Sequence, residues 1–116
     1  LAALRRGGGG ELDALSGVQA MRRLPAPAAA ALQQLAAMYL AWLTPTDAGD
    51  PVARFHLDHR ARLERLDPLG DLSAKGLRQS FGMMVNYLYD LGKIERHHEK
   101  FFLGEVAHSR QIASLL

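Results

Sequence analysis

Five histidines are the residues of this sequence with the most versatile chemistry, because an imidazole transfers protons and binds metals near neutral pH. They are His56, His59, His97, His98 and His108. The spacing of His56 and His59, and the adjacent pair His97-His98, would suit metal ligands. Adjacent residues of a helix point about 100° apart, however, and rarely bind one ion together. The sequence also lacks an H-E-x-x-H motif and any cysteine, so we expect no metal site.

His56 differs from the other four histidines because it follows an alternating pattern. From Val52 to Leu57 apolar side chains recur at every second residue, which places His56 on one face of a strand with Arg54, just before a turn. Side chains at such positions commonly reach a cleft. Two interpretations remain open: a functional histidine, or a half-buried histidine satisfied by a hydrogen bond. The remaining histidines at 97, 98 and 108 are expected on exposed helix faces.

Arginines and tyrosines supply the other candidate groups. Guanidinium groups match phosphate oxygens, so phosphate binding is possible for Arg54, Arg60, Arg62 and Arg65. Acidic residues are interleaved with them, and the alternative is a solvated hairpin with cross-strand ion pairs. Tyr87 and Tyr89 flank Leu88 in an expected helix, where only one of them can lie on the apolar stripe. The other tyrosine is then free for a hydrogen bond.

A β-hairpin is the element expected to position His56. Its two alternating runs, 52–57 and 61–66, are separated only by Asp58-His59-Arg60, although this turn lacks the glycine of the commonest hairpins. The preceding residues 44–51 are rich in Pro, Asp and Gly and predict turns.

Helices are predicted on both sides of the hairpin, at 11–23, 27–43, 73–88, 94–103 and 105–116. Ser73 is the expected N-cap of the third, Gly92 the stop after it, and Gly104 the break between the last two. Four consecutive glycines at 7–10 predict a loop. The fold class is therefore α+β with helices dominating, in a single domain over 1–116. Residues 1–49 form its helical segment, and residues 50–116 form the hairpin with the C-terminal helices.

The composition predicts one soluble domain. The 116 residues include 48% hydrophobic residues and no cysteine, and the net charge of +2 is too small to indicate a nucleic-acid partner. The charge-free stretch 24–46 contains two prolines and two glutamines and gains most of its apolarity from alanine, so we interpret it as a buried helix rather than a membrane span. No targeting signal is visible, which predicts a cytoplasmic protein. The start at Leu1, without methionine, suggests a piece of a longer chain.

A series of sequence words then resembles a known family. The words are Asp50-Pro51-Val52-Ala53-Arg54-Phe55-His56-Leu57, Ala61-Arg62-Leu63-Glu64-Arg65-Leu66, Asp71-Leu72-Ser73-Ala74-Lys75-Gly76-Leu77 and Gly82-Met83-Met84-Val85-Asn86-Tyr87-Leu88-Tyr89. In this order they are similar to the C-terminal region of malonyl-CoA decarboxylases, over residues 50–90. The flanks match loosely.

The resemblance implies a carboxy-lyase of fatty acid metabolism that converts malonyl-CoA to acetyl-CoA and carbon dioxide without a cofactor. It implies that this chain is the last part of a catalytic domain built like the GNAT acetyltransferases, in a homo-oligomer without nucleic-acid or membrane partners. By the same resemblance His56 is the proton donor, Tyr89 is a second catalytic residue, and Asn86 binds substrate. Arg54, with its guanidinium group and its expected place beside His56, is the other predicted substrate-binding residue. The family's catalytic serine lies in an upstream Ser-Pro segment that nothing here matches, so the chain alone is expected to be inactive.

The chain departs from the family pattern at two places. The family usually has Asn-Gly at His59-Arg60 and Asn-Trp at Asp67-Pro68. Asn and Gly accept a positive φ more readily than His and Arg do. The alternative function from another class is a non-catalytic helical interaction module or a nucleic-acid-binding module.

Overall fold

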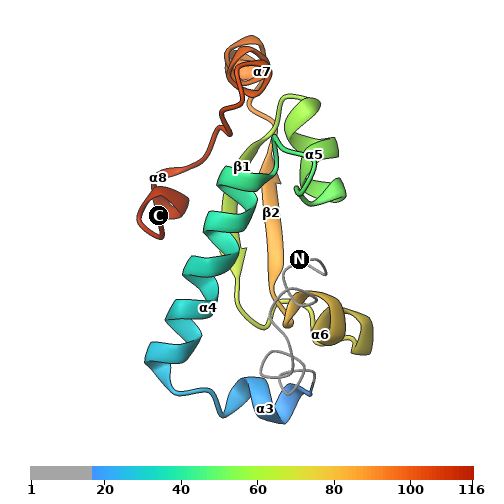
Figure 1. Cartoon of the computed structure of the whole chain (residues 1–116), viewed down its shortest axis with the longest axis vertical. Helices are drawn as coiled ribbons and strands as arrows, with labels where there is room; N and C mark the ends of the chain where they lie inside the picture. Colours follow the sequence, from blue (N-terminus) through green and yellow to red (C-terminus); the bar gives the residue numbers. More distant parts are fainter. Residues whose placement is uncertain (1–16) are drawn as a thin grey trace. The chain divides into compact units, whose positions relative to one another are not determined.

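The computed structural model describes residues 17–116, except for the side chains of Arg78 and Ile94, and contains mostly helix with one small sheet (Figure 1). In chain order the elements are α3 (Val18–Arg22), α4 (Ala26–Met38), the π-helical turn η1 (Tyr39–Leu43), α5 (Pro51–Asp58), β1 (Arg62–Asp67), α6 (Ala74–Ser80), β2 (Met84–Leu88), the 3₁₀ turn η2 (Leu91–Lys93), α7 (Ile94–Phe102) and α8 (Arg110–Ala113). β1 and β2 pair as a two-stranded antiparallel sheet. The predicted helix-dominated α+β class is thus confirmed. The predicted glycine loop at 7–10 lies outside the described residues.

The chain divides into two compact units, which are residues 1–36 with 66–84, and residues 37–65 with 85–116. In the first unit the buried apolar side chains are Met21, Leu32, Ala36, Leu66, Leu77, Phe81 and Met83. The Gln33 side chain ties α4 to the end of β1 by donating to the Leu66 carbonyl at 3.2 Å. The second unit holds α5, α7 and the histidines discussed above.

The helix predicted over 27–43 is confirmed by α4 and η1, which run without a break from Ala26 to Leu43. Its last turn is π-helical, and the buried Thr44 hydroxyl donates back to the Leu40 carbonyl. The turns predicted for 44–51 are also present, with Thr46 N donating to Leu43 O and Gly49 N to Thr46 O. This loop leads directly into α5.

The predicted β-hairpin over 52–66 is wrong, because its first arm is the helix α5. Asp50 is the N-cap and accepts from Ala53 N at 3.0 Å, while Pro51 occupies the first turn, where its missing N–H costs nothing. The buried residues Ala53 and Leu57 are four apart, so they satisfy a helical spacing as well as an alternating one. The strand interpretation used only the second of these spacings.

The N-cap interaction of α5 leads to a prediction about stability. Asp50→Ala removes the acceptor for Ala53 N and is expected to lower the free energy of unfolding by about 1 kcal/mol. Asp50→Asn, which retains an acceptor oxygen, is the matched control and should cost much less. Urea unfolding measures both variants. Equal losses for Ala and Asn would mean that the carboxylate charge, and not the cap, is responsible.

The second arm of the predicted hairpin is a strand, but its partner lies elsewhere in the chain. β1 pairs with β2, whose residues were predicted to continue the helix that starts after Ser73. The N-cap prediction for Ser73 is confirmed, because its hydroxyl accepts from Gly76 N at 3.0 Å. The helix stops early because Phe81 and Gly82 adopt left-handed conformations, with φ of 56° and 71°. Residues after this stop extend into the sheet.

The C-terminal third agrees with prediction only in part. The helix predicted over 94–103 is α7, and the predicted break at Gly104 has φ of 84°. The helix predicted over 105–116 is reduced to the four residues of α8, because the residues before it extend along β1. There Leu63 forms a parallel bridge with His108, flanked by the bonds Leu63 N to Ala107 O and Ser109 N to Leu63 O. Gly92 lies in η2 rather than ending a helix.

Of the helix predicted over 11–23, the described part is α3. None of the helices described between residues 17 and 116 has the length and apolar character that crossing a bilayer requires.

Candidate active site

His56 lies in the last turn of α5, and the end of that helix is closed by a pair of backbone hydrogen bonds. Ala61 N donates to the His56 carbonyl at 3.0 Å, and Arg60 N donates to the Leu57 carbonyl at 3.2 Å. Arg60 adopts φ of 79°. This combination is the Schellman motif, in which one left-handed residue reverses the chain after a helix. These hydrogen bonds therefore hold the His56 carbonyl group, and with it the backbone that carries the imidazole.

The imidazole of His56 lies against two tyrosines from the end of β2. Its Nδ1 is 2.7 Å from the Tyr89 hydroxyl oxygen, which is a hydrogen bond between two side chains 33 residues apart. Its ring stacks on that of Tyr87, with centroids 4.2 Å apart and planes inclined by 20°. Tyr87 and Tyr89 reach the same ring because residues two apart on an extended chain point to one side. The ring of His56 is thus fixed in both plane and rotation.

The hydrogen bond to Tyr89 determines which atom of His56 is available for chemistry. Nδ1 is occupied by the Tyr89 hydroxyl, which can donate to it or accept from it. The opposite nitrogen, Nε2, is then the atom from which a proton can be delivered. Because His56 is only half-buried, a ligand from outside the helix can approach it. The arrangement suits a general acid.

Tyr87 acts in this cluster as a stacking surface rather than as a proton donor. Burial raises the pKa of its hydroxyl far above the ordinary value, and the negative charges of Asp50 and of an ionised Tyr89 act in the same direction. The phenol consequently stays protonated throughout the physiological range. The sequence predicts only one of Tyr87 and Tyr89 on the apolar stripe of a helix, whereas the extended chain at the end of β2 brings both to His56.

Arg54 does not accompany His56, contrary to the expectation of a shared strand face. Residues two apart on a helix are separated by about 200° around its axis. Arg54 Nε instead donates to the Thr44 carbonyl at 3.3 Å, which ties α5 to the preceding loop. Asn86 precedes Tyr87 in β2, so the alternation of the strand directs its side chain to the opposite face from the two tyrosines. Of the predicted site residues, the structure therefore brings together His56 and Tyr89.

The arginines of β1 are also placed differently from the predicted hairpin. Arg62 pairs with Glu64 on the same strand, with Nε 2.7 Å from Oε2, and both side chains are partly exposed. An exposed pair of this kind contributes little to stability. This ion pair joins two residues of one strand, whereas the predicted hairpin would have formed ion pairs between its two strands.

The exposure of the other histidines differs in part from the prediction. His98 and His108 are exposed, as expected, although His108 lies in an extended segment rather than a helix. His97 was predicted to be exposed and is buried, with 6% of its surface accessible; α7 packs beside α5, and His97 Nδ1 lies 3.3 Å from the Arg60 carbonyl oxygen. His59 Nδ1 contacts the Phe55 carbonyl at 2.6 Å within its own helix. Among the described residues, no group of three or more His, Cys, Asp or Glu side chains could hold a metal ion.

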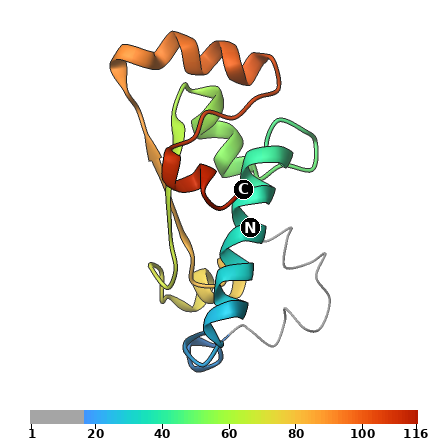
Figure 2. The ribbon, with the colours of Figure 1, turned by 90° about the vertical axis from the view of Figure 1, so that its left-hand side faces the viewer.

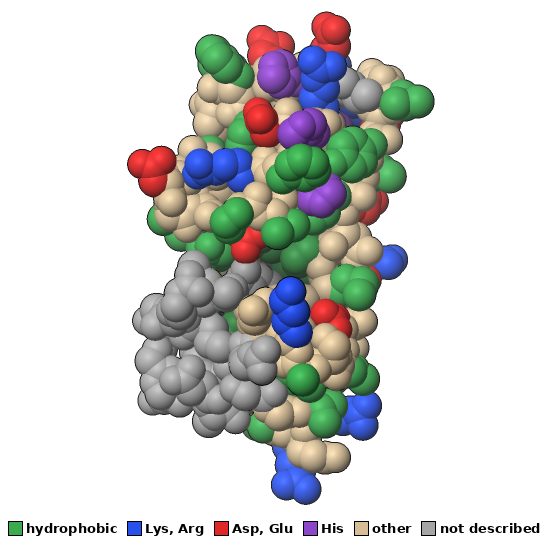
Figure 3. All heavy atoms as spheres, turned by 90° about the vertical axis from the view of Figure 1, so that its right-hand side faces the viewer, with side chains coloured by type: hydrophobic (Ala, Val, Ile, Leu, Met, Phe, Trp, Pro, Cys, Tyr) green, Lys and Arg blue, Asp and Glu red, His purple; other side chains and the backbone are tan. Residues whose placement is uncertain are grey.

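The surface around α5 is apolar and aromatic. Val52 and Phe55 on its outer side are 61% and 57% exposed, and Phe55 lies against the rings of both His56 and His59. In the space-filling view, histidine side chains gather among hydrophobic ones on this face (Figure 3). An open groove of about 380 Å³ runs along the outer side of α5, between the 47–51 loop and His59.

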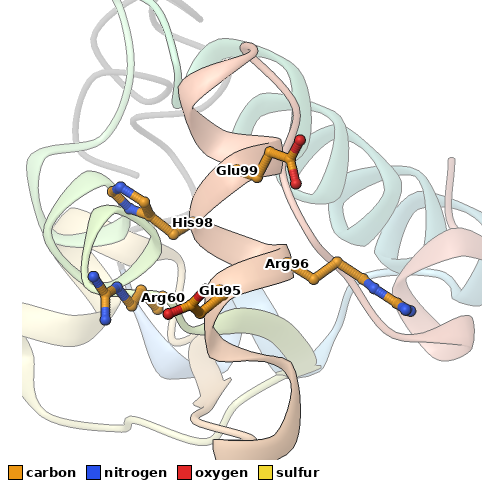
Figure 4. A pocket seen from close by; sticks show the side chains of 5 residues that line it. All are labelled: Arg60, Glu95, Arg96, His98 and Glu99. Carbon is orange, nitrogen blue, oxygen red and sulfur yellow. The ribbon is translucent and has the colours of Figure 1, made fainter.

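α7 packs beside α5 in the second unit (Figure 2). An open groove of about 490 Å³ lies here, lined by Arg60, Glu95, Arg96, His98 and Glu99. The Glu95 and His98 side chains extend from α7 toward the side on which Arg60 lies, while Arg96 and Glu99 extend to the other side (Figure 4). The lining carries both positive and negative side chains, so this groove does not favour binding of either an anion or a cation.

The left-handed Arg60 leads to a prediction about stability. A residue with a Cβ at positive φ costs roughly 1 kcal/mol that glycine avoids, so Arg60→Gly is expected to raise the free energy of unfolding by about 0.5–1 kcal/mol. The expected gain comes from the helix end, and not from the two-residue hairpin turn that the sequence suggested. His59→Asn, at φ of −87°, is the control and should change little. A lower unfolding midpoint for Arg60→Gly in urea would mean that the arginine side chain contributes more than its backbone strain costs.

Comparison with known proteins now gives the family. The model of the malonyl-CoA decarboxylase C-terminal domain matches residues 12–116. The chain therefore belongs to the malonyl-CoA decarboxylase family. Among curated relatives, the mitochondrial malonyl-CoA decarboxylases of Rattus norvegicus and Mus musculus are each 50% identical to it over 68 residues, which is 58% of this chain and 14% of each relative.

Solved structures agree with this assignment. The malonyl-CoA decarboxylase from Agrobacterium vitis is 49% identical with a TM-score of 0.70, over 75% of this chain and 22% of that one. The enzyme from Cupriavidus metallidurans is 34% identical with a TM-score of 0.77, over 100% of this chain and 31% of that one. The chain thus spans about a third or less of the length of these relatives. The resemblance drawn from residues 50–90 is confirmed and extends to both flanks.

Proposed function

We propose that this chain supplies the proton-donating part of the active site of a malonyl-CoA decarboxylase, with His56 as the donor. The observation that carries the proposal is the cluster of His56, Tyr87 and Tyr89, in which one imidazole nitrogen is held at 2.7 Å and the ring is stacked at 4.2 Å. The family membership supports the reaction and the substrate, malonyl-CoA. The roles of His56 and Tyr89 are those that the resemblance implies, and the geometry of the cluster supports them.

The proposed chemistry needs a proton at carbon. The bond between the carboxylate carbon and the α-carbon of malonyl-CoA breaks, carbon dioxide leaves, and the electron pair remains on the α-carbon as the thioester enolate. His56 Nε2–H then gives its proton to this carbon, which forms the methyl group of acetyl-CoA. In this step His56 starts with a hydrogen on both ring nitrogens, so the ring left behind is neutral and its Nδ1–H continues to donate to the Tyr89 hydroxyl oxygen. His56 regains a proton from solvent before the next turnover.

In this proposal the Tyr89 hydroxyl orients the His56 imidazole, and the stacked Tyr87 ring limits rotation of that imidazole. Asn86 remains a predicted substrate-binding residue on the strength of the resemblance, and Arg54 remains one for its guanidinium group, although neither is part of the His56 cluster. The relation of this region to a GNAT-like domain, the homo-oligomer and the cytoplasmic location also stay predictions. The same holds for the upstream serine and for the inactivity of the 116 residues taken alone.

The proposed function is tested with the natural polypeptide that contains this sequence. It is incubated with malonyl-CoA in D₂O, and acetyl-CoA and carbon dioxide are quantified. We expect both products, with solvent deuterium in the methyl group of acetyl-CoA, because the α-carbon takes its proton from an exchangeable donor. Binding of malonyl-CoA without release of carbon dioxide would overturn the proposal in favour of a non-catalytic role.

A further inference from the structure

His97 is a buried titratable residue that the proposed mechanism does not use. It lies on α7 and is 6% exposed, whereas the adjacent His98 is exposed. Its Nδ1 is 3.3 Å from the carbonyl oxygen of Arg60, a residue 37 positions earlier in the chain. Because a carbonyl oxygen only accepts, the hydrogen in this bond belongs to His97 Nδ1. The imidazole is therefore a donor directed at the chain that follows α5.

The peptide group that receives this bond also holds His56. The Arg60 carbonyl accepts from His97, and the N–H of the same peptide group, on Ala61, donates to the His56 carbonyl at 3.0 Å. A peptide group is planar and moves as one body. Any tilt of its carbonyl end therefore displaces its N–H end as well. His97 and His56 are thereby linked through two hydrogen bonds and one rigid group.

This peptide group needs to be held because Arg60 is strained. With φ of 79°, Arg60 occupies the left-handed region, which is energetically unfavourable for a residue with a Cβ. Rotation toward an ordinary φ would relieve that strain and move the Arg60–Ala61 peptide away from the end of α5. The His97 bond opposes this rotation from the carbonyl side.

We propose that His97 is a positioning residue for His56, acting through the Arg60–Ala61 peptide group. The inference rests on the proposed role of His56 in catalysis. Displacement of the last turn of α5 would shift the His56 imidazole relative to the Tyr89 hydroxyl and the Tyr87 ring that define its direction. Proton delivery to carbon depends steeply on such alignment. Binding of substrate does not depend on it in the same way, so the effect belongs in kcat and not in KM.

The test compares variants of His97 in the natural polypeptide that contains this sequence. His97→Leu removes the donor, and His97→Asn retains an N–H close to the position of Nδ1. His98→Leu, on the next residue of the same helix, is the matched control. His97→Met is a second donor-free variant, whose flexible side chain can fill the site if His97→Leu does not fold. Steady-state kinetics with malonyl-CoA and amide hydrogen exchange at Ala61 are measured for each variant.

We expect the donor-free variant to lower kcat about fivefold with KM changed less than about twofold, and to speed Ala61 exchange about fivefold. His97→Asn should recover most of kcat and of the exchange protection, and His98→Leu should match the unsubstituted protein. Unchanged kcat in the donor-free variant, or an equal loss in His97→Asn, would overturn the positioning role. If His56→Asn itself retains turnover, the proposed function fails. If only the His97 variants are silent, the present inference fails alone.

Discussion

His56→Asn is expected to lower the turnover of malonyl-CoA by roughly 10²- to 10⁴-fold, the usual contribution of a positioned general acid. Asparagine places a polar atom close to the position of the imidazole Nδ1, so it can keep the contact with the Tyr89 hydroxyl. It has no group at the position of Nε2, from which the proton is proposed to leave. The substitution therefore removes the acid while retaining the anchor.

The loss should appear in kcat, because protonation of the enolate follows substrate binding. The dissociation constant of acetyl-CoA, measured by calorimetry, is expected to change by less than about twofold. Asparagine keeps the contact with Tyr89, so the shape of the site is retained while the proton donor is lost. His59→Asn is the control, since His59 is the exposed C-cap residue of the same helix and its contacts described here are with the Phe55 carbonyl and ring. That control should leave turnover near normal.

Two outcomes would contradict the catalytic assignment. Near-normal turnover in His56→Asn would mean that another group delivers the proton. Unfolding of the variant, judged by a large drop in the urea midpoint, would mean that His56 is chiefly a structural residue satisfied by Tyr89. The sequence alone could not separate these two interpretations, because both require a half-buried histidine with a partner.

The helices were predictable where apolar spacing and end signals agree. The stripe of α4 fits only a helix, since its apolar residues recur over several turns without any alternating pattern. Ser73 was identified as an N-cap because its hydroxyl precedes a run at helical spacing, and it caps α6 as expected. In these segments local chemistry and tertiary packing favour the same structure.

α5 was missed because its apolar spacing is compatible with two structures. Ala53 and Leu57 fall on one face of a strand and also on one face of a helix. The deciding signal was present at the start, where Asp50 and Pro51 form an N-cap followed by a first-turn proline. The same two residues also fit the turn pattern of 44–51, which conceals the start of the helix. The error moved His56 from a strand to a helix and gave it a wrong companion in Arg54.

β2 was missed for a different reason, which is that its start depends on unusual backbone at Phe81 and Gly82. A left-handed phenylalanine is uncommon, and its side chain gives no sequence signal for this conformation.

The burial of His97 had a weak signal, because Phe101 follows four residues later on the same face of α7. The stacking of His56 on Tyr87 could not be predicted, since it needs both β2 and α5 to be correctly assigned.

Tyr89→Phe is the second large effect we expect, with turnover lowered roughly ten- to a hundredfold through loss of a side-chain hydrogen bond that fixes the imidazole. Phenylalanine keeps the ring and removes only the hydroxyl that lies 2.7 Å from Nδ1. The His56 imidazole would then lose its anchor at Nδ1 and could adopt the flipped orientation while still stacked on Tyr87, so Nε2 would spend less time directed at the substrate.

Tyr87→Phe is the matched control for Tyr89→Phe, because it removes a hydroxyl from the neighbouring tyrosine of the same cluster. The stack on His56 uses the face of the Tyr87 ring, and the raised pKa of this tyrosine makes its hydroxyl a poor proton donor, so turnover should change by less than about threefold. Kinetics of both variants across pH would separate their roles. Equal losses in the two variants would mean that the cluster acts through packing alone, and a large loss confined to Tyr87→Phe would reverse the roles assigned to the two tyrosines.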